Sequence, residues 1–270
     1  SHDAPPMSKL TISDLQAARK AGRQLTETFT DSANEARACA DAGIDMIVCM
    51  KENLAAIRAA APEVFIVAAN EIRQPHIATP NQAVAAGFEL MNMGADAIYS
   101  SMGLPAVEAM ASERIPVVGH VGYVPYHSSW FGGPRAVGKR ADEALSVFNA
   151  AKAYQDAGAI AVEIEIVPAE VTAEIAKRLD IILISMGAGA AGATVQYLFA
   201  TDILGTNTGH VPRHAKVYGN LAEEEARVQQ LRVDAFKAFK DDVDKGGYPA
   251  EQHNLKIKAE EFERFLSLLP

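Results

Sequence analysis

Two glutamates in one apolar run have the spacing for acid–base chemistry. Glu163 and Glu165 lie two residues apart within residues 159–166, AIAVEIEI. Side chains two apart in a strand project to the same side, so both carboxyl groups face one way. Such a pair repels, and burial raises the pKa of at least one member, which suits a general base or acid. The alternative is a structural ion pair with Lys or Arg, since buried carboxylates are usually paired.

A histidine stands at the end of another apolar run. Residues 115–118, IPVV, predict a buried strand that ends on the sequence GHVG, which contains His120. Neighbouring glycines let other atoms approach the backbone, which favours a ligand contact by His120, although a histidine bonded to backbone is the alternative. Residues 123–137 mix aromatics, prolines and glycines and predict a loop that folds over the site.

These residues must be positioned by an alternation of strands and helices. Apolar and β-branched runs predict strands at residues 23–30, 44–50, 64–69, 95–99, 115–118, 159–166 and 181–184. Helical patterns lie at 11–21, 34–42, 52–61, 80–93, 104–112, 141–157 and 169–178, followed by 221–244 and 259–269. Parallel neighbours need crossover helices, and about eight such units close economically into a barrel. We therefore predict an α/β fold, a (β/α)8 TIM barrel, as one domain over residues 1–270 with C-terminal helices.

Composition excludes several classes of protein. A hydrophobic content of 49% suits a large core, and no run of about 18 apolar residues predicts a membrane span. The net charge of −9 argues against a nucleic-acid surface, but local groups can still bind a small anion. Cys39 and Cys49 lie in apolar runs and are expected to be reduced, and residues 1–7 lack the pattern of a signal peptide. A cytoplasmic location is expected.

Several motifs resemble one enzyme family. Residues 115–144, IPVVGHVGYVPYHSSWFGGPRAVGKRADEA, resemble the block P-V-x-G-H-x-G-x-x-P…F-G-G-x-x-V-x-G-R of ketopantoate hydroxymethyltransferases. Further similar segments are AIAVEIEIVPAE at 159–170, the Gly-rich turn within 184–189, GHVPRHAK at 209–216 and GYPAEQH at 247–253. The second half of the chain matches strongly and the first half much less.

The resemblance implies a fold and two site residues. That family consists of (β/α)8 barrels of the phosphoenolpyruvate mutase and isocitrate lyase superfamily, and its members form homo-oligomers. It implies that His120 binds the 2-oxo acid and that Glu165 is the catalytic base, which removes a proton from C3. It also implies Mg2+ and, as co-substrate, methylenetetrahydrofolate.

The first half departs from the family pattern. Lys51 stands where the family has a magnesium-binding Asp, and Glu71 takes the place of the second metal-binding Asp. After the fourth strand, Tyr99 and Ser101 replace a Lys and a Glu. Lys51 and Glu71 could together hold a substrate carboxylate or an enolate by charge-assisted bonds, although a solvated role for Lys51 is the alternative. The long family insertion between the second and third strands is missing, which predicts a different pocket.

These observations lead to a function and its alternatives. We expect a transferase that adds a one-carbon unit to a small 2-oxo acid through an enolate. Glu165 is the expected catalytic residue; His120, Lys51, Glu71, Tyr99 and Ser101 are the expected substrate contacts, with Glu71 also a candidate metal ligand. Alternatives are a carbon–carbon lyase, decarboxylase or mutase on an oxaloacetate-like 2-oxo acid, and a non-catalytic barrel that binds a 2-oxo acid. A metal shell of Glu52, Asn70 and Glu71 is a further alternative.

Overall fold

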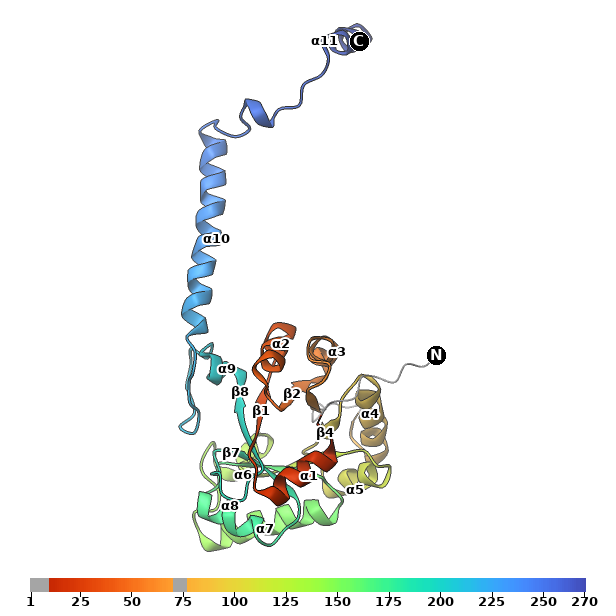
Figure 1. The fold of residues 1–270 in the computed structure, drawn as a ribbon, viewed down its shortest axis with the longest axis vertical. Coiled ribbons are helices and arrows are strands. Elements are labelled where there is room, and N and C mark those ends of the chain that lie inside the picture. Colours follow the sequence, from red (N-terminus) through yellow and green to blue (C-terminus); the bar gives the residue numbers. More distant parts are fainter. Residues whose placement is uncertain (1–9, 70–76) are drawn as a thin grey trace. The chain divides into compact units, whose positions relative to one another are not determined.

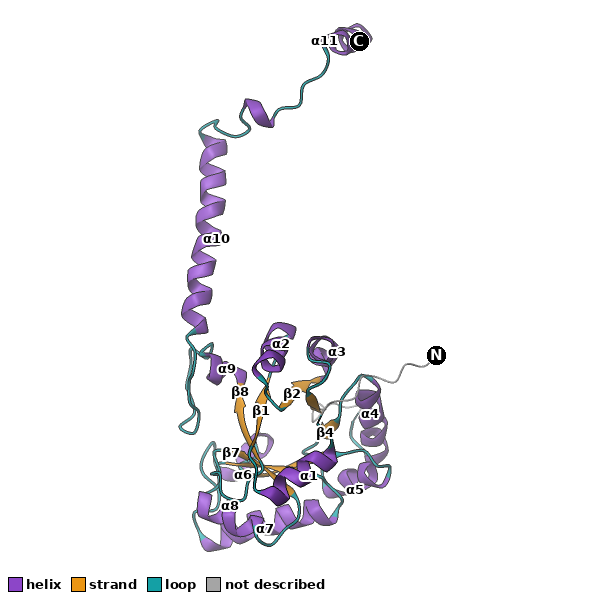
Figure 2. Ribbon diagram, in the orientation of Figure 1, coloured by secondary structure: helices purple, strands orange, loops and turns teal. Residues whose placement is uncertain are grey.

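A closed barrel of parallel strands forms the main body of the protein (Figure 1, Figure 2). The computed structural model describes residues 10–69 and 77–270, and the contacts divide the chain into two units, Ser1–Gly219 and Asn220–Pro270. The strands are β1 (Leu25–Phe29), β2 (Met46–Met50), β3 (Phe65–Ala69), β4 (Ala97–Tyr99), β5 (Val117–Gly122), β6 (Ala161–Glu165), β7 (Ile182–Met186) and β8 (Val195–Phe199). Each strand pairs with the next, and β8 pairs with β1. The predicted (β/α)8 barrel is confirmed.

Helices cover the outside of the barrel, most of them between consecutive strands, with α1 before β1 and α9 after β8. They are α1 (Ile12–Ala21), α2 (Ala33–Ala42), α3 (Lys51–Ala60), α4 (Pro80–Asn92), α5 (Leu104–Ser112), α7 (Ala141–Asp156), α8 (Ala169–Ala176) and α9 (Ala200–Leu204). Their starts follow local chemistry: Thr11 and Thr79 each form a capping box, with Asp14 and Gln82 as partners. Apolar helix faces pack on the outward side chains of the strands, such as Ile47 and Ile66.

Strand alternation divides the barrel interior into an apolar base and a polar upper part. The inward side chains near the strand starts are apolar: Leu25, Met46, Phe65, Val67, Ala97, Val118, Ala161, Ile182, Ile184 and Val195. Polar inward side chains come later on five strands: Glu27, Tyr99, His120, Glu163, Glu165 and Tyr197. The barrel therefore carries its polar groups toward the carboxyl ends of the strands, where barrel enzymes hold their active sites.

Two segments differ from the sequence-based prediction. The fifth strand continues to Gly122 rather than ending at residue 118, so His120 lies inside β5. Strand β8 was not predicted, because its five residues include the polar Gln196 and follow a glycine-rich turn. The expected loop at 123–137 contains two short helices, η1 (Pro125–His127) and α6 (Ser128–Phe131).

The second unit, Asn220–Pro270, consists of α10 (Leu221–Asp244), η2 (Glu251–His253) and α11 (Ala259–Leu268). Both long helices match the ranges predicted from their amphipathic pattern, with ends that agree within a residue. Their inclusion in a single domain of residues 1–270 stays a prediction. Within the described part of the chain, no helix is long and apolar enough to cross a bilayer.

Candidate active site

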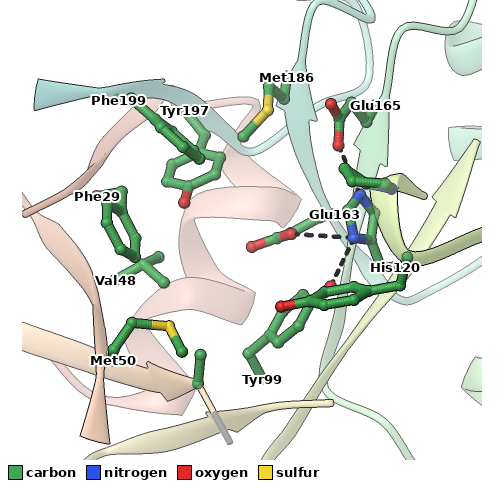
Figure 3. A pocket seen from close by; sticks show the side chains of 13 residues that line it. Phe29, Val48, Met50, Tyr99, His120, Glu163, Glu165, Met186, Tyr197 and Phe199 are labelled. Carbon is green, nitrogen blue, oxygen red and sulfur yellow. Dashed lines mark hydrogen bonds and ion pairs between the residues drawn. The ribbon is translucent and has the colours of Figure 1, made fainter. Parts of the chain in front are cut away.

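A cavity of about 310 Å³ opens at the carboxyl ends of the strands, and every strand of the barrel contributes to its wall (Figure 3). The lining residues are Phe29, Val48, Met50, Ala69, Tyr99, His120, Pro125, Tyr126, Glu163, Glu165, Met186, Tyr197 and Phe199. Three of the expected site residues, Tyr99, His120 and Glu165, lie in this one cavity. Its size suits a small molecule.

His120 is held at both ring nitrogens. Its Nε2 lies 2.9 Å from Oε2 of Glu165, and its Nδ1 lies 2.7 Å from the hydroxyl of Tyr99. An ionised carboxylate can only accept, so Nε2 donates to Glu165. In the neutral imidazole the Tyr99 hydroxyl donates to Nδ1, whereas in the protonated imidazole Nδ1 donates to the Tyr99 oxygen. This pairing fixes the orientation of the imidazole and of the Glu165 carboxylate.

The glycines beside His120 serve packing within the fold. A side chain on Gly119 would collide with the ring of Tyr154, which lies on α7. Gly122 has φ of +82°, and a side chain there would meet the backbone oxygen of Glu165. The expectation that these glycines open the backbone to a ligand is wrong, because both positions are filled by the chain itself.

Burial and neighbouring charges shift the pKa values of the titratable side chains that line the cavity. Burial alone would lower the pKa of His120, but the hydrogen bond to Glu165 and the charges of Glu163 and Glu165 oppose it, and the pKa is raised. Burial raises the pKa of Glu163 to about 8, and the charges of Glu27 and Glu165 act in the same direction, while His120 opposes them. Burial also raises the pKa of Tyr99 well above its usual value. Burial and the two acidic neighbours therefore favour the protonated form of Glu163.

A third acid lies inside the barrel, and the sequence analysis did not single it out. Glu27 in β1 is buried, and within the described residues neither of its carboxyl oxygens has a hydrogen-bond partner. Burial raises its pKa to about 8. The available signal was the alternation of β1, which places Leu25, Glu27 and Phe29 on the inward side.

Lys51 and Ser101 do not line the cavity. Lys51 begins α3, and its ammonium group lies 2.8 Å from Oε1 of Glu89 on α4, with both side chains well exposed to solvent. Ser101 is buried after β4, and its hydroxyl lies close enough to Tyr99 to affect the pKa of that phenol. Glu71 lies outside the described residues, as does Asn70.

The loop after β5 reaches the cavity through two residues, Pro125 and Tyr126. Two further side chains of this loop do not reach the cavity: Trp130 is 86% exposed, and Arg135 pairs with Glu143 at 2.6 Å. The Arg135 pair ties the loop to the start of α7. Exclusion of water on this side therefore depends on the proline and tyrosine.

Aromatic and aliphatic side chains form the wall opposite His120. The rings of Phe29 and Phe199 are stacked, with centroids 5.1 Å apart, and Tyr197 contacts Phe199 edge-on at 5.7 Å. Val48 and Met50 continue this wall along β2 (Figure 3). The cavity thus pairs an acid–base face with an apolar face, which suits a small polar compound that carries an apolar substituent.

The described residues do not fit the magnesium site that the family resemblance implies. Nowhere in residues 10–69 and 77–270 do three His, Cys, Asp or Glu side chains group so that they could hold a metal ion. Lys51 occupies the position of one family ligand and pairs with Glu89. Glu71, one of the proposed ligands, lies outside the described residues, so its role as a metal ligand stays a prediction.

Comparisons with known proteins agree with this architecture. The family model described as ketopantoate hydroxymethyltransferase matches residues 9–251. A 3-methyl-2-oxobutanoate hydroxymethyltransferase of Methylibium petroleiphilum is 29% identical, with 98% of this chain and 96% of that protein covered. One from Frankia alni is 32% identical over 93% of this chain and 88% of that protein. Among solved structures, a phosphonopyruvate hydrolase complex with oxalate and Mg++ has a TM-score of 0.52 at 15% identity, covering 96% and 98% of the two chains, which shows a shared fold.

Proposed function

Because the chain belongs to the ketopantoate hydroxymethyltransferase family, we propose that it adds a one-carbon unit to a small 2-oxo acid through an enolate. The curated relatives are named for 3-methyl-2-oxobutanoate, and that acid is the proposed substrate. Its branched alkyl group suits the apolar wall of Phe29, Val48 and Met50. Methylenetetrahydrofolate is the proposed one-carbon donor.

The hydrogen bond between His120 and Glu165 is the observation that carries this proposal. Glu165 is the proposed base that removes the proton from C3, because its carboxylate lies in the cavity and is oriented by His120 Nε2. The imidazole in turn is oriented by Tyr99. Abstraction of a proton next to a carbonyl requires a base that neighbouring groups hold in place by hydrogen bonds, and Glu165, His120 and Tyr99 form such an arrangement.

Several finer assignments accompany the proposal. A role of Glu71 in holding the substrate carboxylate through a metal ion is also proposed, as are a homo-oligomeric assembly and a cytoplasmic location. Free thiols at Cys39 and Cys49 agree with a reducing compartment. No catalytic step is assigned to Mg2+, since the described residues do not fit it.

The test is exchange of the C3 proton of 3-methyl-2-oxobutanoate in deuterium oxide, followed by NMR. Wild-type protein should catalyse exchange, and Glu165→Gln should lower the rate about 100- to 10,000-fold, the usual range for loss of a general base. Glu170→Gln, at an exposed position five residues on, is the matched control and should retain the wild-type rate. Absence of exchange by the wild type with donor and Mg2+ present would refute the proposed function. Cleavage of an oxaloacetate-like acid would then support the lyase alternative.

A further inference from the structure

We propose that Glu163 is a second catalytic residue, which in its protonated form donates a hydrogen bond to the oxygen of the 2-oxo group and stabilises the enolate. Glu27 is a positioning residue that keeps the proton on Glu163. This inference rests on the proposed function and identifies what stabilises its intermediate. It assigns roles to Glu163 and Glu27, two buried acids that have no role in proton abstraction by Glu165.

The Glu163 carboxyl group lies inside the cavity. Glu163 precedes Glu165 by two residues in β6, so both side chains enter the same cavity. Figure 3 shows the Glu163 carboxyl group in the space between His120 and Tyr197. Its Oε2 lies 3.6 Å from His120 Nδ1, an ion-pair distance that is too long for a good hydrogen bond, and Nδ1 is already bonded to the Tyr99 hydroxyl. The carboxyl group can therefore still form a hydrogen bond with a ligand.

The charged groups around Glu163 influence its protonation. The titratable groups that influence it are His120 from β5, Glu165 from β6 itself and Glu27 from β1, while Tyr99 and Tyr197 feel its charge from β4 and β8. Among the described residues that line the cavity, none is Lys or Arg. Burial and two acidic neighbours favour the neutral acid over the carboxylate. A neutral carboxylic acid has an O–H donor, whereas a carboxylate has none.

Glu27 is a buried acid without a hydrogen-bond partner among the described residues. Its position in β1 is in register with Tyr197 of β8, which lines the cavity, and its charge acts on both Tyr197 and Glu163. Within the described residues, no donor satisfies its two buried oxygens, so ionisation of Glu27 is unfavourable. Two acids that influence each other titrate together, and loss of a proton from one opposes loss from the other. Glu27 thus helps Glu163 to remain protonated.

The proton abstraction balances with these groups, and the carbon–carbon bond formation also needs water and the folate donor. Glu165 takes the C3 proton, the C3–H electron pair becomes the C2=C3 bond, and the carbonyl pair moves onto the oxygen that accepts the Glu163 hydrogen bond. Water hydrolyses the methylene bridge of the donor, which gives formaldehyde and releases tetrahydrofolate. When C3 attacks the formaldehyde carbon, the C2=O bond re-forms, the π pair of formaldehyde moves onto its oxygen, and that oxygen takes the proton from Glu165. Glu163 keeps its proton throughout. A neutral acid as donor to a developing enolate is an established pattern in ketosteroid isomerase.

The test compares Glu163→Leu, Glu163→Gln and Glu27→Gln, with Glu170→Gln as control, in the C3 exchange assay from pH 6 to pH 10. Glu163→Leu removes the donor and should lower kcat about 100- to 1,000-fold with little change in KM, as for other oxyanion donors. Glu163→Gln keeps an N–H donor that does not titrate, so it should be less impaired and should lack the fall in rate that is expected of the wild type above about pH 8. In Glu27→Gln, the exchange rate should begin to fall at a lower pH than in the wild type. A Glu163→Leu rate equal to wild type, or an unchanged pH profile in Glu163→Gln, would overturn the inference.

A spectroscopic readout separates this inference from the proposed function. Infrared difference spectra of the wild type between pH 6 and pH 10 should contain a carboxylic-acid carbonyl band that Glu163→Gln removes. If exchange is normal but that band is missing, the inference about Glu163 fails and the proposed function stands. If the wild type catalyses no exchange, both fail together.

Discussion

Nε2 of His120 and Oε2 of Glu165 lie 2.9 Å apart, although the residues are 45 positions apart in the chain. Neighbouring parallel strands, β5 and β6, produce this contact, because their register places Gly122 beside Glu165 and His120 beside Glu163. The absence of a side chain at Gly122 allows the two strands to approach at this point. The site is therefore a direct product of strand pairing.

Replacement of His120 tests the orienting role of the imidazole. His120→Ala removes both the donor to Glu165 and the ring nitrogen that bonds Tyr99, so kcat for exchange should fall about 100-fold or more. The control is His127→Ala, at an exposed position in the loop after β5 that does not line the cavity. Equal rates for the two variants would remove His120 from the mechanism.

Glu27 should make the protein less stable as the pH rises. Its pKa is about 8 in the folded protein, raised from the value of 4.5 for an exposed glutamate, so between these pH values only the folded state holds the proton. Stability then falls with rising pH across this window and levels off above it. Glu27→Gln has no such proton to lose, and its advantage over the wild type should grow by an amount on the order of a few kcal/mol from pH 5 to pH 8.

Urea unfolding at pH 5 and pH 8 measures this difference. Glu113→Gln, at an exposed position, should show the pH dependence of the wild type and serves as control. If the wild type and Glu27→Gln lose stability in parallel, Glu27 is not protonated in the folded protein at neutral pH.

Lys51 offers a test of the substrate contact inferred from the sequence. Its ammonium group pairs with Glu89 at the surface, so Lys51→Ala should leave exchange kinetics unchanged and cost at most about 1 kcal/mol of stability. A double-mutant cycle with Glu89→Ala measures the coupling between the two side chains. A large rise in KM for the 2-oxo acid in Lys51→Ala alone would instead place the ammonium group on the substrate.

Treatment with a chelator tests whether magnesium takes part, since the family resemblance implies this ion and the described residues do not fit it. With Glu163 as donor to the enolate oxygen, C3 exchange should persist after treatment with EDTA and dialysis. Loss of exchange on chelation, with recovery on addition of Mg2+, would show that a metal ion takes part and would favour the proposed ligand role of Glu71. Glu71→Gln would then lower the apparent affinity for Mg2+.

Local pattern and alternation were enough to predict most of the barrel. The apolar runs that become β2 and β3 and the capped starts of α1 and α4 depend on nearby residues, and they were placed within a few positions. The shared face of Glu163 and Glu165 follows from the two-residue period of a strand. These features need no knowledge of distant contacts.

The remaining features depend on long-range packing. The extension of β5 to Gly122 requires pairing with β6, and the five residues of β8 become a strand through β1 and β7. The side chain of Lys51 is directed by Glu89 from another helix, which the family pattern around residue 51 did not indicate. The burial of Glu27 opposite Tyr197 likewise arises only when the barrel closes.

The deuterium content at C3 of recovered 3-methyl-2-oxobutanoate, compared between wild type and Glu165→Gln, tests the central claim most directly. We predict rapid labelling by the wild type and labelling near the uncatalysed rate by Glu165→Gln. Equal labelling by both proteins would contradict the assignment of Glu165 as the base.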